Sequence, residues 1–402
     1  MKHGTIIPLI GGMALGASKA MEENPSWAVS WKDFGTNEQN FKEYFNGVPF
    51  RTLDNDNLES ISLSDDIFKN TMIVSAVPPC AGLSRLNPTI GNKTANAEHD
   101  YKSNKWMYLA SSLILRDVKP KVMIFENAPG LMQNFGSWVR KQAIDIGVKY
   151  GYSVSFVFTT STLHGLPQNR KRSFVFFWDS EYAPNFKWYN KSFLSPKEIL
   201  QEQYEKYKDT PEHKKCILKD IFTDSNYYKF CVQKFGKDWR DGMLSKYKEL
   251  PKSVSLEYFL FQMNLQDEFI EFLKADGEDK NAKHIKHIEH AKYKVSIGKG
   301  WWNASSHFYR EGIPFNAITM RAPNMLHPTE DRYLSVREHM IFMGLPNDFY
   351  LQNDYLNAVF QNVPVNTAAD WTSFARDFVE GNTTPSNSKV LFGDNIKQKQ
   401  WT

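Results

Sequence analysis

The stretch Met72-Ile73-Val74-Ser75-Ala76-Val77-Pro78-Pro79-Cys80-Ala81-Gly82-Leu83-Ser84 organises the rest of the chain. Its mainly apolar first six residues predict a short buried strand, and the two prolines prevent a strand or helix from continuing. Cys80 therefore lies on a turn just beyond the carboxyl end of a strand, the edge where doubly wound sheets bind ligands. A lone cysteine is usually a small buried hydrophobe. The rigid Pro-Pro entry and the Gly82 exit instead favour a functional side chain on this loop.

Length and composition describe a folded protein of more than one domain. The chain has 402 residues, more than a single growing core accommodates, so two domains are expected. The formal net charge of +4 is too small to indicate a nucleic-acid partner by itself, although a local basic face is compatible with it. Three scattered cysteines, Cys80, Cys216 and Cys231, form neither a disulfide framework nor a zinc-type pair. We therefore expect a reducing cytoplasmic setting and no metal.

The amino-terminal apolar run, residues 6–17, has two interpretations. It resembles a secretory signal, but Pro8 and Gly11-Gly12 interrupt it, as in a strand that enters a glycine turn and a helix. The rest of the chain favours the strand. No segment is long enough to span a membrane. At the other end, the polar residues after Glu380 predict a loosely held tail.

Polar residues follow the first two predicted strands, 5–10 and 27–31. The glycine turn that ends the first strand lets the backbone approach a ligand beside a helix amino terminus. Asp33 follows the second strand, where nucleotide sites hold ribose hydroxyls, and Asp54 offers a similar acid before the central strand. Taken singly, these residues fit an ordinary turn and solvated loop acids equally well.

Two further strand ends carry charge. Glu126-Asn127 follows the apolar run 122–125 and precedes a forced turn, although Glu126 could simply cap the next helix. Arg170 and Arg172 alternate at the entry to the strand 173–178, so both guanidinium groups share a face and can hold a phosphate or a carboxylate. A solvated basic turn is the plain alternative.

Together these pieces resemble one family, the DNA cytosine-C5 methyltransferases. The matching motifs are Pro78-Pro79-Cys80 with Ser84, Glu126-Asn127, Gln168 with Arg170 and Arg172, Gly11-Gly12 with Gly16, Arg332 to Glu338 with Met343 to Pro346, and Gln361 to Val365. They occur in the family's order over about the first 180 and the last 90 residues. Several motifs in order are more specific than any one of them.

The resemblance implies an α/β fold, a doubly wound Rossmann-like sheet of the S-adenosylmethionine-dependent methyltransferases with a second, smaller target-recognition domain. Residues 1–180 and 311–402 are expected to form the catalytic and cofactor-binding domain, and 181–310 the target-recognition domain. The partner implied is double-stranded DNA. We expect a monomeric modification enzyme of the prokaryotic or phage type, as in restriction-modification systems.

The resemblance also assigns roles to residues. Cys80 adds to C6 of a flipped-out cytosine, Glu126 hydrogen-bonds N3 and the exocyclic amine, Arg172 holds the base and orients Glu126, and Arg170 braces the loop or a phosphate. Burial should raise the pKa of Glu126. The expected cofactor contacts are Ile10, Gly11, Gly12, Gly16, Trp31, Asp33, Asp54, Pro78, Gln361, Asn362 and Val363. The expected substrate contacts are Ser84, Asn127 and Gln168, with residues 87–104 as a closing loop.

Some positions depart from the family. Ile7 and Leu9 stand where the cofactor turn usually has an aromatic residue and another glycine, and Phe360 and Gln361 replace an expected Gly-Asn. Which of Gln361 and Asn362 contacts the cofactor stays open. Two alternatives to DNA methylation also remain, methylation of cytosine in RNA such as tRNA and a catalytically inactive DNA-binding homologue.

The middle of the chain shows little resemblance to the family. Its lysines and aromatic residues suit phosphate contact and base stacking, and equally the core and rim of any small domain. Arg310 and Arg321 are possible base readers. His284, His287 and His290 recur every third residue, so on a helix their rings diverge, which favours a polar or phosphate-contacting face over a metal site.

Overall fold

The computed structural model describes residues 1–31, 35–53, 61–84, 107, 110–214, 221–246, 253–298, 307–309, 314–318, 325–352 and 356–398. Asp33, Asp54, the predicted closing loop 87–104, Arg310 and Arg321 lie outside these described residues. The chain forms two compact units, Met1–Phe193 with Met340–Thr402, and Leu194–His339. The sequence suggested divisions at 180/181 and 310/311, whereas the contacts divide the chain at 193/194 and 339/340.

The first unit is built on an eight-stranded sheet of order β12-β6-β8-β5-β4-β1-β2-β3. Its strands are β1 His3–Ile6, β2 Trp27–Trp31, β3 Phe50–Leu53, β4 Ile73–Ala76, β5 Val122–Asn127, β6 Ser153–Thr160, β8 Lys171–Trp178 and β12 Val390–Asp394. Strand β8 runs antiparallel to both of its neighbours, β5 and β6, and the other pairs of this sheet are parallel. This mixed, doubly wound α/β sheet confirms the predicted fold class.

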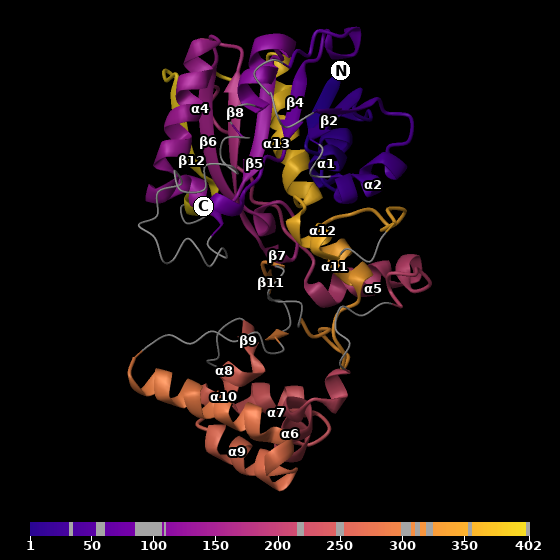
Figure 1. Ribbon diagram of the computed structural model, residues 1–402, viewed down its shortest axis with the longest axis vertical. Coiled ribbons are helices and arrows are strands. Elements are labelled where there is room, and N and C mark those ends of the chain that lie inside the picture. Colours follow the sequence, from indigo (N-terminus) through magenta and orange to yellow (C-terminus); the bar gives the residue numbers. More distant parts are fainter. Residues whose placement is uncertain are drawn as a thin grey trace. The chain divides into compact units, whose positions relative to one another are not determined.

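Helices cover both faces of the sheet. The helices of this unit that bear on the site are α1 Gly12–Met21, α2 Gly35–Tyr44, α4 Ser137–Lys149, α12 Leu356–Gln361 and α13 Val365–Val379. Helix α4 packs against β6, whereas α13 packs against α1 and β5. Figure 1 shows α4 in front of the sheet and α13 behind it. The strands are nearly continuously buried because both faces are covered, which explains their unbroken apolar runs.

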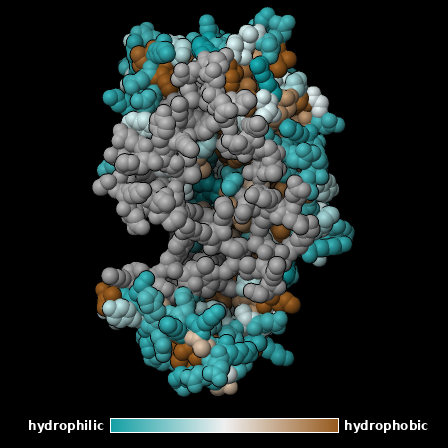
Figure 2. Space-filling view, in the orientation of Figure 1, coloured by the Kyte–Doolittle hydropathy of each residue, from teal (hydrophilic) through white to brown (hydrophobic). Residues whose placement is uncertain are grey.

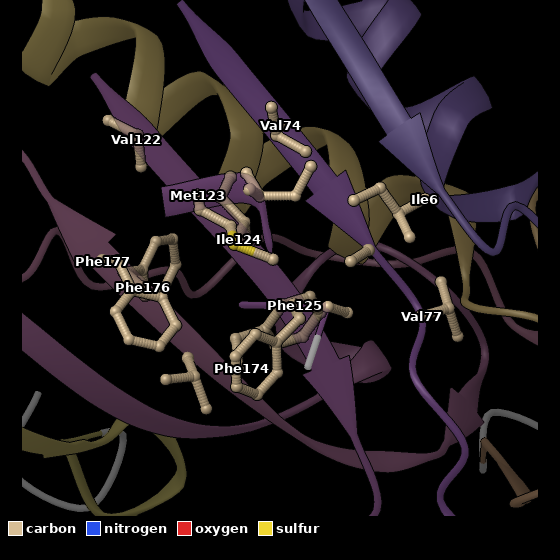
Figure 3. Packing of buried hydrophobic residues seen from close by; sticks show 14 of the residues in the cluster. Ile6, Val74, Val77, Val122, Met123, Ile124, Phe125, Phe174, Phe176 and Phe177 are labelled. Carbon is tan, nitrogen blue, oxygen red and sulfur yellow. The ribbon is translucent and has the colours of Figure 1, made fainter. Parts of the chain in front are cut away.

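Apolar side chains from neighbouring strands interdigitate at the centre of the sheet. Figure 3 shows Val74 of β4 with Met123 and Phe125 of β5, which the strand register places on one face of the sheet, and Phe174 and Phe176 of β8, which it places on the other. All five are buried. This core fixes the strands whose carboxyl ends carry the candidate site.

The predicted loose tail is wrong for the described residues up to 398. Strand β12, Val390–Asp394, pairs in parallel with β6 and extends the sheet. Its Phe392 stacks on Phe156 of β6, with ring centroids 5.0 Å apart. The strand was missed because five residues in a polar context carry a weak local pattern, and the pairing that orders them is long-range.

Gly12 and Gly16 allow α1 to approach α13 closely. A Cβ at Gly16 would lie 2.4 Å from Cβ of Ala368 and 2.7 Å from the backbone oxygen of Val365. A Cβ at Gly12 would lie 2.2 Å from the backbone oxygen of Val363. These glycines were predicted as cofactor contacts. Close packing is a structural requirement on both residues, and their role as cofactor contacts stays a prediction.

Gly16→Ala is expected to destabilise the protein by about 1–3 kcal/mol, because the new methyl group overpacks against backbone that cannot move aside. The better helix propensity of alanine, worth about 1 kcal/mol, offsets only part of this cost. Urea denaturation measures the effect. Lys19→Ala, an exposed position on the same helix, is the control and should be near neutral. A Gly16→Ala protein as stable as the wild type would refute the close-packing argument.

The second unit is mainly helical. It contains α5 Pro196–Tyr207, α6 Asn226–Phe235, α7 Trp239–Lys246, α8 Leu256–Gln262, α9 Gln266–Ala275 and α10 Glu278–Ser296, and the strands β9 Ser253–Ser255 and β10 His307–Tyr309 pair antiparallel. It has its own hydrophobic core, which includes Phe230, Trp239, Phe259, Phe269 and Ile288. No helix among the described residues is both long and apolar enough to cross a membrane.

Glu338 is the centre of a buried charged cluster in this unit. It lies in α11, Val336–Phe342, and accepts hydrogen bonds from both terminal nitrogens of Arg332 at 2.9 and 2.7 Å. The backbone N–H of Ser335 donates to it at 2.7 Å. Burial alone raises the pKa of Glu338, but the Arg332 hydrogen bonds and charge, with His327 and Ser335, outweigh it and lower the pKa to about 2.

Glu338→Gln is expected to cost roughly 2 kcal/mol of unfolding free energy at pH 7, because it removes the buried carboxylate that binds half-buried Arg332 through two hydrogen bonds and leaves only the exposed Glu330 as its ion-pair partner. The wild-type stabilisation from Glu338 should be complete above the unfolded pKa of a glutamate and lost as the pH falls towards about 2, since the folded-state pKa is depressed. Denaturation curves between pH 7 and pH 3 test both statements. The control is Glu271→Gln, which removes an exposed ion pair with Lys274 and should cost about 0.5 kcal/mol or less. Equal losses for the two variants would contradict this account.

Candidate active site at the carboxyl edge of the sheet

One loop carries the cofactor turn and another carries Cys80. These loops follow the adjacent strands β1 and β4 and begin at the same level of the sheet. Strands β1 and β4 are paired in register, with Ile6 opposite Ala76. From β1 the strand order runs to β2 and β3 on one side, and from β4 to β5 on the other. Such a switch point opens a crevice at the carboxyl ends of the strands. The predicted ligand edge therefore lies between the loops 7–11 and 77–80.

Cys80 is held on a short, rigid connection. Pro78 is buried and Pro79 half-buried, and the backbone N–H of Leu83 donates to the carbonyl of Cys80 at 3.0 Å, closing a turn. Cys80 itself is exposed. The prolines remove backbone freedom, so the thiol is presented at the sheet edge with little conformational entropy left to lose.

Glu126 and Arg172 form an ion pair across two antiparallel strands. Glu126 of β5 is opposite Phe174 of β8, and Arg172 precedes Phe174 by two residues, on the same face of the sheet. Arg172 Nε lies 2.5 Å from Glu126 Oε1, and both side chains are largely buried. Both strands are longer than predicted, so these two residues project from the sheet itself rather than from loops. Their geometry is correspondingly well fixed.

The protonation of Cys80 and Glu126 is set by burial and by each other. Desolvation raises the pKa of the Cys80 thiol although solvent reaches the residue, and the negative charge of Glu126 raises it further. Desolvation also raises the pKa of Glu126, as predicted. Arg172 and Arg170 oppose both shifts without overcoming them. Each group is close enough to influence the other, which places the predicted nucleophile and acid in one site.

Arg170 contacts different parts of the protein from Arg172. It is almost fully buried, and its guanidinium donates to the carbonyls of Phe360 at 2.5 Å and Asn362 at 3.1 Å. Burial lowers the pKa of Arg170, and the charge of Arg172 lowers it further. The side chain ties the segment between α12 and α13 to the start of β8. This supports the predicted bracing role, with backbone rather than phosphate as the partner.

Asn362 lies against the glycine turn, whereas Gln361 is exposed. The side-chain oxygen of Asn362 accepts from the backbone N–H of Gly12 at 2.8 Å. Its amide nitrogen is buried and has no hydrogen-bond partner among the described residues. The choice between Gln361 and Asn362 that the sequence left open therefore favours Asn362. Val363, the next residue in the segment, is buried beside it.

The turn after β1 has an unusual backbone. Ile7 and Leu9 adopt positive φ angles of 50° and 54°, and Gly11 has φ 115°. A left-handed conformation is uncommon for a non-glycine residue and strained for a β-branched one. Both side chains are buried in the core of the sheet. Leu9 thus stands where the family usually has a glycine, and its backbone keeps a positive φ angle of the kind that glycine adopts easily.

The remaining predicted cofactor residues are close to this turn in the sheet. Ile10 is fully buried, and Trp31 is buried at the carboxyl end of β2, the strand next to β1. Pro78 follows the neighbouring β4. The structure thus gathers these residues at one edge from three adjacent strands.

Two of the predicted substrate contacts are buried and hydrogen-bonded within the protein. Gln168 is fully buried, and its amide donates to the carbonyl of Phe342 and, at 3.1 Å, to the sulfur of Met343. Asn127 is also buried, and its side chain accepts from the N–H of Ala128 at 2.8 Å, which shapes the turn after β5. Both residues hold the walls of the site. Ser84 is half-buried at the end of the Cys80 turn and remains a candidate for substrate contact.

No sequence motif indicated that Glu38 lies near the cofactor turn. It is 1% exposed on α2, and burial raises its pKa to about 7. It shares a helix face with Phe41 and Phe45, whose rings would contact a Cβ at Gly11 at 3.5 Å. An acid one turn before an aromatic pair, in the helix after β2, is the signal that could have placed it beside the cofactor turn.

No group of three or more His, Cys, Asp or Glu side chains in the described ranges could hold a metal ion. The side chains at this edge that can take part in chemistry include Cys80, Glu126 and Arg172. This nucleophile, acid and oriented guanidinium beside the glycine turn of a doubly wound sheet form the arrangement expected of an α/β methyltransferase.

Comparison with known proteins agrees with this class. The family model of the C-5 cytosine-specific DNA methylases matches residues 5–368. The type II methyltransferase M.AgeI of Thalassovita gelatinovora is 26% identical over 104 residues, which span 26% of this chain and 22% of that protein. The chain therefore belongs to the C-5 cytosine-specific DNA methylase family.

Solved structures share the fold at low sequence identity. A protein from an E. coli prophage, described as a DNA modification methyltransferase, has a TM-score of 0.58 and 14% identity, over 94% of this chain and 99% of that one. The methyltransferase EhMeth of Entamoeba histolytica has a TM-score of 0.52 and 14% identity, over 94% of this chain and 98% of that one. At such identities the likeness concerns the fold alone.

Proposed function

We propose that this protein transfers a methyl group from S-adenosylmethionine to C5 of a flipped-out cytosine in duplex DNA, through a covalent bond between Cys80 and C6. The observation that carries the proposal is the placement of Cys80 beside the Glu126–Arg172 ion pair, at the carboxyl ends of neighbouring strands. Family membership and the prophage DNA methyltransferase of the same fold support the choice of DNA.

The residues at the switch point fit S-adenosylmethionine. The buried amide nitrogen of Asn362, which has no partner among the described residues, can donate to a ring nitrogen or a carboxylate. We assign Ile10, Gly11, Trp31, Pro78 and Val363 to the same binding edge, and we propose Asp33 and Asp54 as further contacts. When bound, the cofactor supplies an electrophilic methyl group on a sulfonium.

The reaction begins at Cys80, because C5 of cytosine is a poor nucleophile until the ring is activated. Addition of the Cys80 sulfur to C6 makes a C–S bond and moves electron density to C5 and N3. The raised pKa of Cys80 means that the free protein holds a thiol rather than a thiolate. Its proton has to leave as the base docks, so the nucleophile is formed only in the presence of substrate.

Glu126 supports this addition by donating a proton towards N3. Only a protonated carboxyl can donate, and the raised pKa of Glu126 favours that form. Arg172 orients the carboxyl through its 2.5 Å contact with Oε1. After methylation, a base takes the C5 proton, the Cys80 sulfur leaves and the N3 proton returns to Glu126, which restores the aromatic ring.

The target cytosine has to leave the duplex, because neither face of C6 is accessible in the stack. Extrusion costs a few kcal/mol, which protein contacts must offset. We propose that Ser84 and the loop 87–104 contribute on the catalytic side and that the second unit recognises the target sequence. We further propose a monomeric, cytoplasmic enzyme of the restriction-modification or phage type.

The proposal is tested by product analysis. The protein is incubated with S-adenosylmethionine and either mixed-sequence duplex DNA or tRNA, and the nucleosides of the digested product are identified by mass spectrometry. The proposal predicts 5-methyldeoxycytidine from duplex DNA. Methylation of tRNA alone would reassign the substrate to RNA, and no product from either would indicate an inactive homologue.

A further inference from the structure

Helix α10 of the second unit has one face in the core and one in solvent. Ile285, Ile288 and Ala291 are buried, as is Asn281 near its start. At 3.6 residues per turn these positions define one side of the helix. The opposite side is formed by residues such as 283, 286, 290 and 294, which cannot reach the core.

The solvent side of α10 carries a row of lysines, Lys283, Lys286 and Lys294, which we call the α10 lysine face. Lys283 and Lys286 are exposed and Lys294 is half-exposed, and none of the three has an ion-pair partner among the described residues. The exposed side chains of His290 and Tyr293 lie between them on the same side. The surface over α10 is mainly hydrophilic in Figure 2.

Other lysines of this unit differ from those of the α10 lysine face because they form ion pairs with acidic side chains. Lys234, Lys274 and Lys280 pair with Glu268, Glu271 and Asp276. Lys292, also on α10 but turned away from the lysine face, pairs with Asp267. Local acids therefore pair with these lysines, whereas the three lysines of the α10 lysine face form no ion pair with a described residue, although Asp279 and Glu289 lie one turn from Lys283 and Lys286.

Two histidines of α10 contact neighbouring elements. His284 Nε2 lies 3.1 Å from the hydroxyl of Tyr227, and the exposed His287, at the edge of the α10 lysine face, has Nε2 2.8 Å from Oε1 of buried Glu257. Burial raises the pKa of Glu257 to about 8. These two histidines thus point to different neighbours and hold the helix in place. A firmly held helix presents its lysines at fixed spacing.

We propose that the α10 lysine face contacts the phosphate backbone of duplex DNA outside the flipped base. Lysine is a compact point charge that suits phosphate. The face spans about 16 Å at 1.5 Å per residue, which matches roughly five base-pair steps of 3.4 Å. Tyr293 adds a hydrogen-bond donor of the kind that often contacts phosphate. The inference rests on the proposed function, since it takes DNA as the substrate.

The test compares two triple variants with the same change in charge. Lys283→Gln/Lys286→Gln/Lys294→Gln removes the α10 lysine face, and Lys234→Gln/Lys274→Gln/Lys280→Gln removes paired lysines of the same unit. Binding of a fluorescent 30-base-pair duplex by the full-length protein is measured between 50 and 200 mM salt. Thermal unfolding checks that both variants are folded.

The lysine-face variant should bind roughly 10- to 100-fold more weakly at ~0.1 M salt, with a log–log salt slope reduced by about 2–3, because each lost phosphate contact lowers it by about 0.9. The control variant should lose less than about threefold in affinity. Equal slopes for both variants and the wild type would overturn the inference while leaving the proposed function intact. Wild-type protein that binds tRNA but no duplex DNA would overturn both.

Discussion

Cys80→Ala is expected to abolish methyl transfer, with a loss of at least about 10³-fold in kcat. Without the sulfur no bond forms to C6, and the cytosine ring keeps the electron distribution that makes C5 unreactive. Losses of this size or larger follow removal of the nucleophile in other enzymes that use covalent catalysis. The loop itself should persist, because its shape comes from Pro78, Pro79 and the Leu83–Cys80 backbone hydrogen bond.

The change has a matched control in the same chain. Cys231 is buried in the core of the second unit, so Cys231→Ala should keep its kcat per folded molecule while losing some stability. Methylation is measured by transfer of labelled methyl groups to duplex DNA, alongside binding of that DNA. Retained turnover in Cys80→Ala would remove the covalent mechanism, whereas parallel loss of DNA binding in both variants would indicate misfolding.

Glu126→Gln is expected to reduce kcat by roughly 10²–10⁴-fold, because an amide cannot transfer a proton towards N3. The substitution preserves the shape of the side chain but removes the charge that faces Arg172. It also removes a negative charge that raises the pKa of Cys80. The Cys80 thiol of this variant should therefore react faster with iodoacetamide at neutral pH, although methylation is slower.

The pH profile distinguishes this role from a merely structural one. The reactive form of the site has a Cys80 thiolate and a protonated Glu126 carboxyl. It carries the same number of protons as the form with a Cys80 thiol and a Glu126 carboxylate, which predominates between the two pKa values. Wild-type kcat/KM should therefore be level between the pKa of Glu126 and that of Cys80 and fall on both sides. Both pKa values are raised, so the acid limb should lie above the usual range of a glutamate.

In Glu126→Gln the acid limb due to Glu126 disappears. Residual activity should rise with pH until Cys80 is ionised, at a lower pH than in the wild type. Peptide mapping separates Cys80 alkylation from that of Cys216 and Cys231. An unchanged profile with an unchanged alkylation rate would mean that Glu126 does not interact with the nucleophile.

The sequence predicted those features of the candidate site that depend on residues adjacent in the chain. Pro78-Pro79 ends a strand by covalent geometry alone, so the position of Cys80 at a sheet edge followed from a few residues. The raised pKa of Glu126 also followed, because a carboxylate at the end of an apolar run is desolvated once the sheet is covered. The order of the motifs identified the fold before any tertiary contact was known.

Long-range contacts account for what the sequence could not predict. Gly12 and Gly16 were predicted as cofactor contacts, but their packing against α13 and the segment before it, about 350 positions later in the chain, was not. Gln168 was predicted as a substrate contact, but its hydrogen bond to Phe342 was not. Strand β12 depends on β6 for its pairing. No local pattern specifies such partners, because each is chosen by the folded surroundings.

The most direct test of the central claim is covalent trapping. The protein is incubated with S-adenosylmethionine and a mixed-sequence duplex that contains 5-fluorocytosine, and the products are separated on a denaturing gel and analysed by mass spectrometry. Fluorine at C5 cannot leave as a proton does, so the reaction stops with the protein attached to DNA. The account predicts an adduct that maps to Cys80 and carries the transferred methyl group, absent in Cys80→Ala. An adduct at another residue, or none under conditions where the enzyme methylates ordinary DNA, would contradict it.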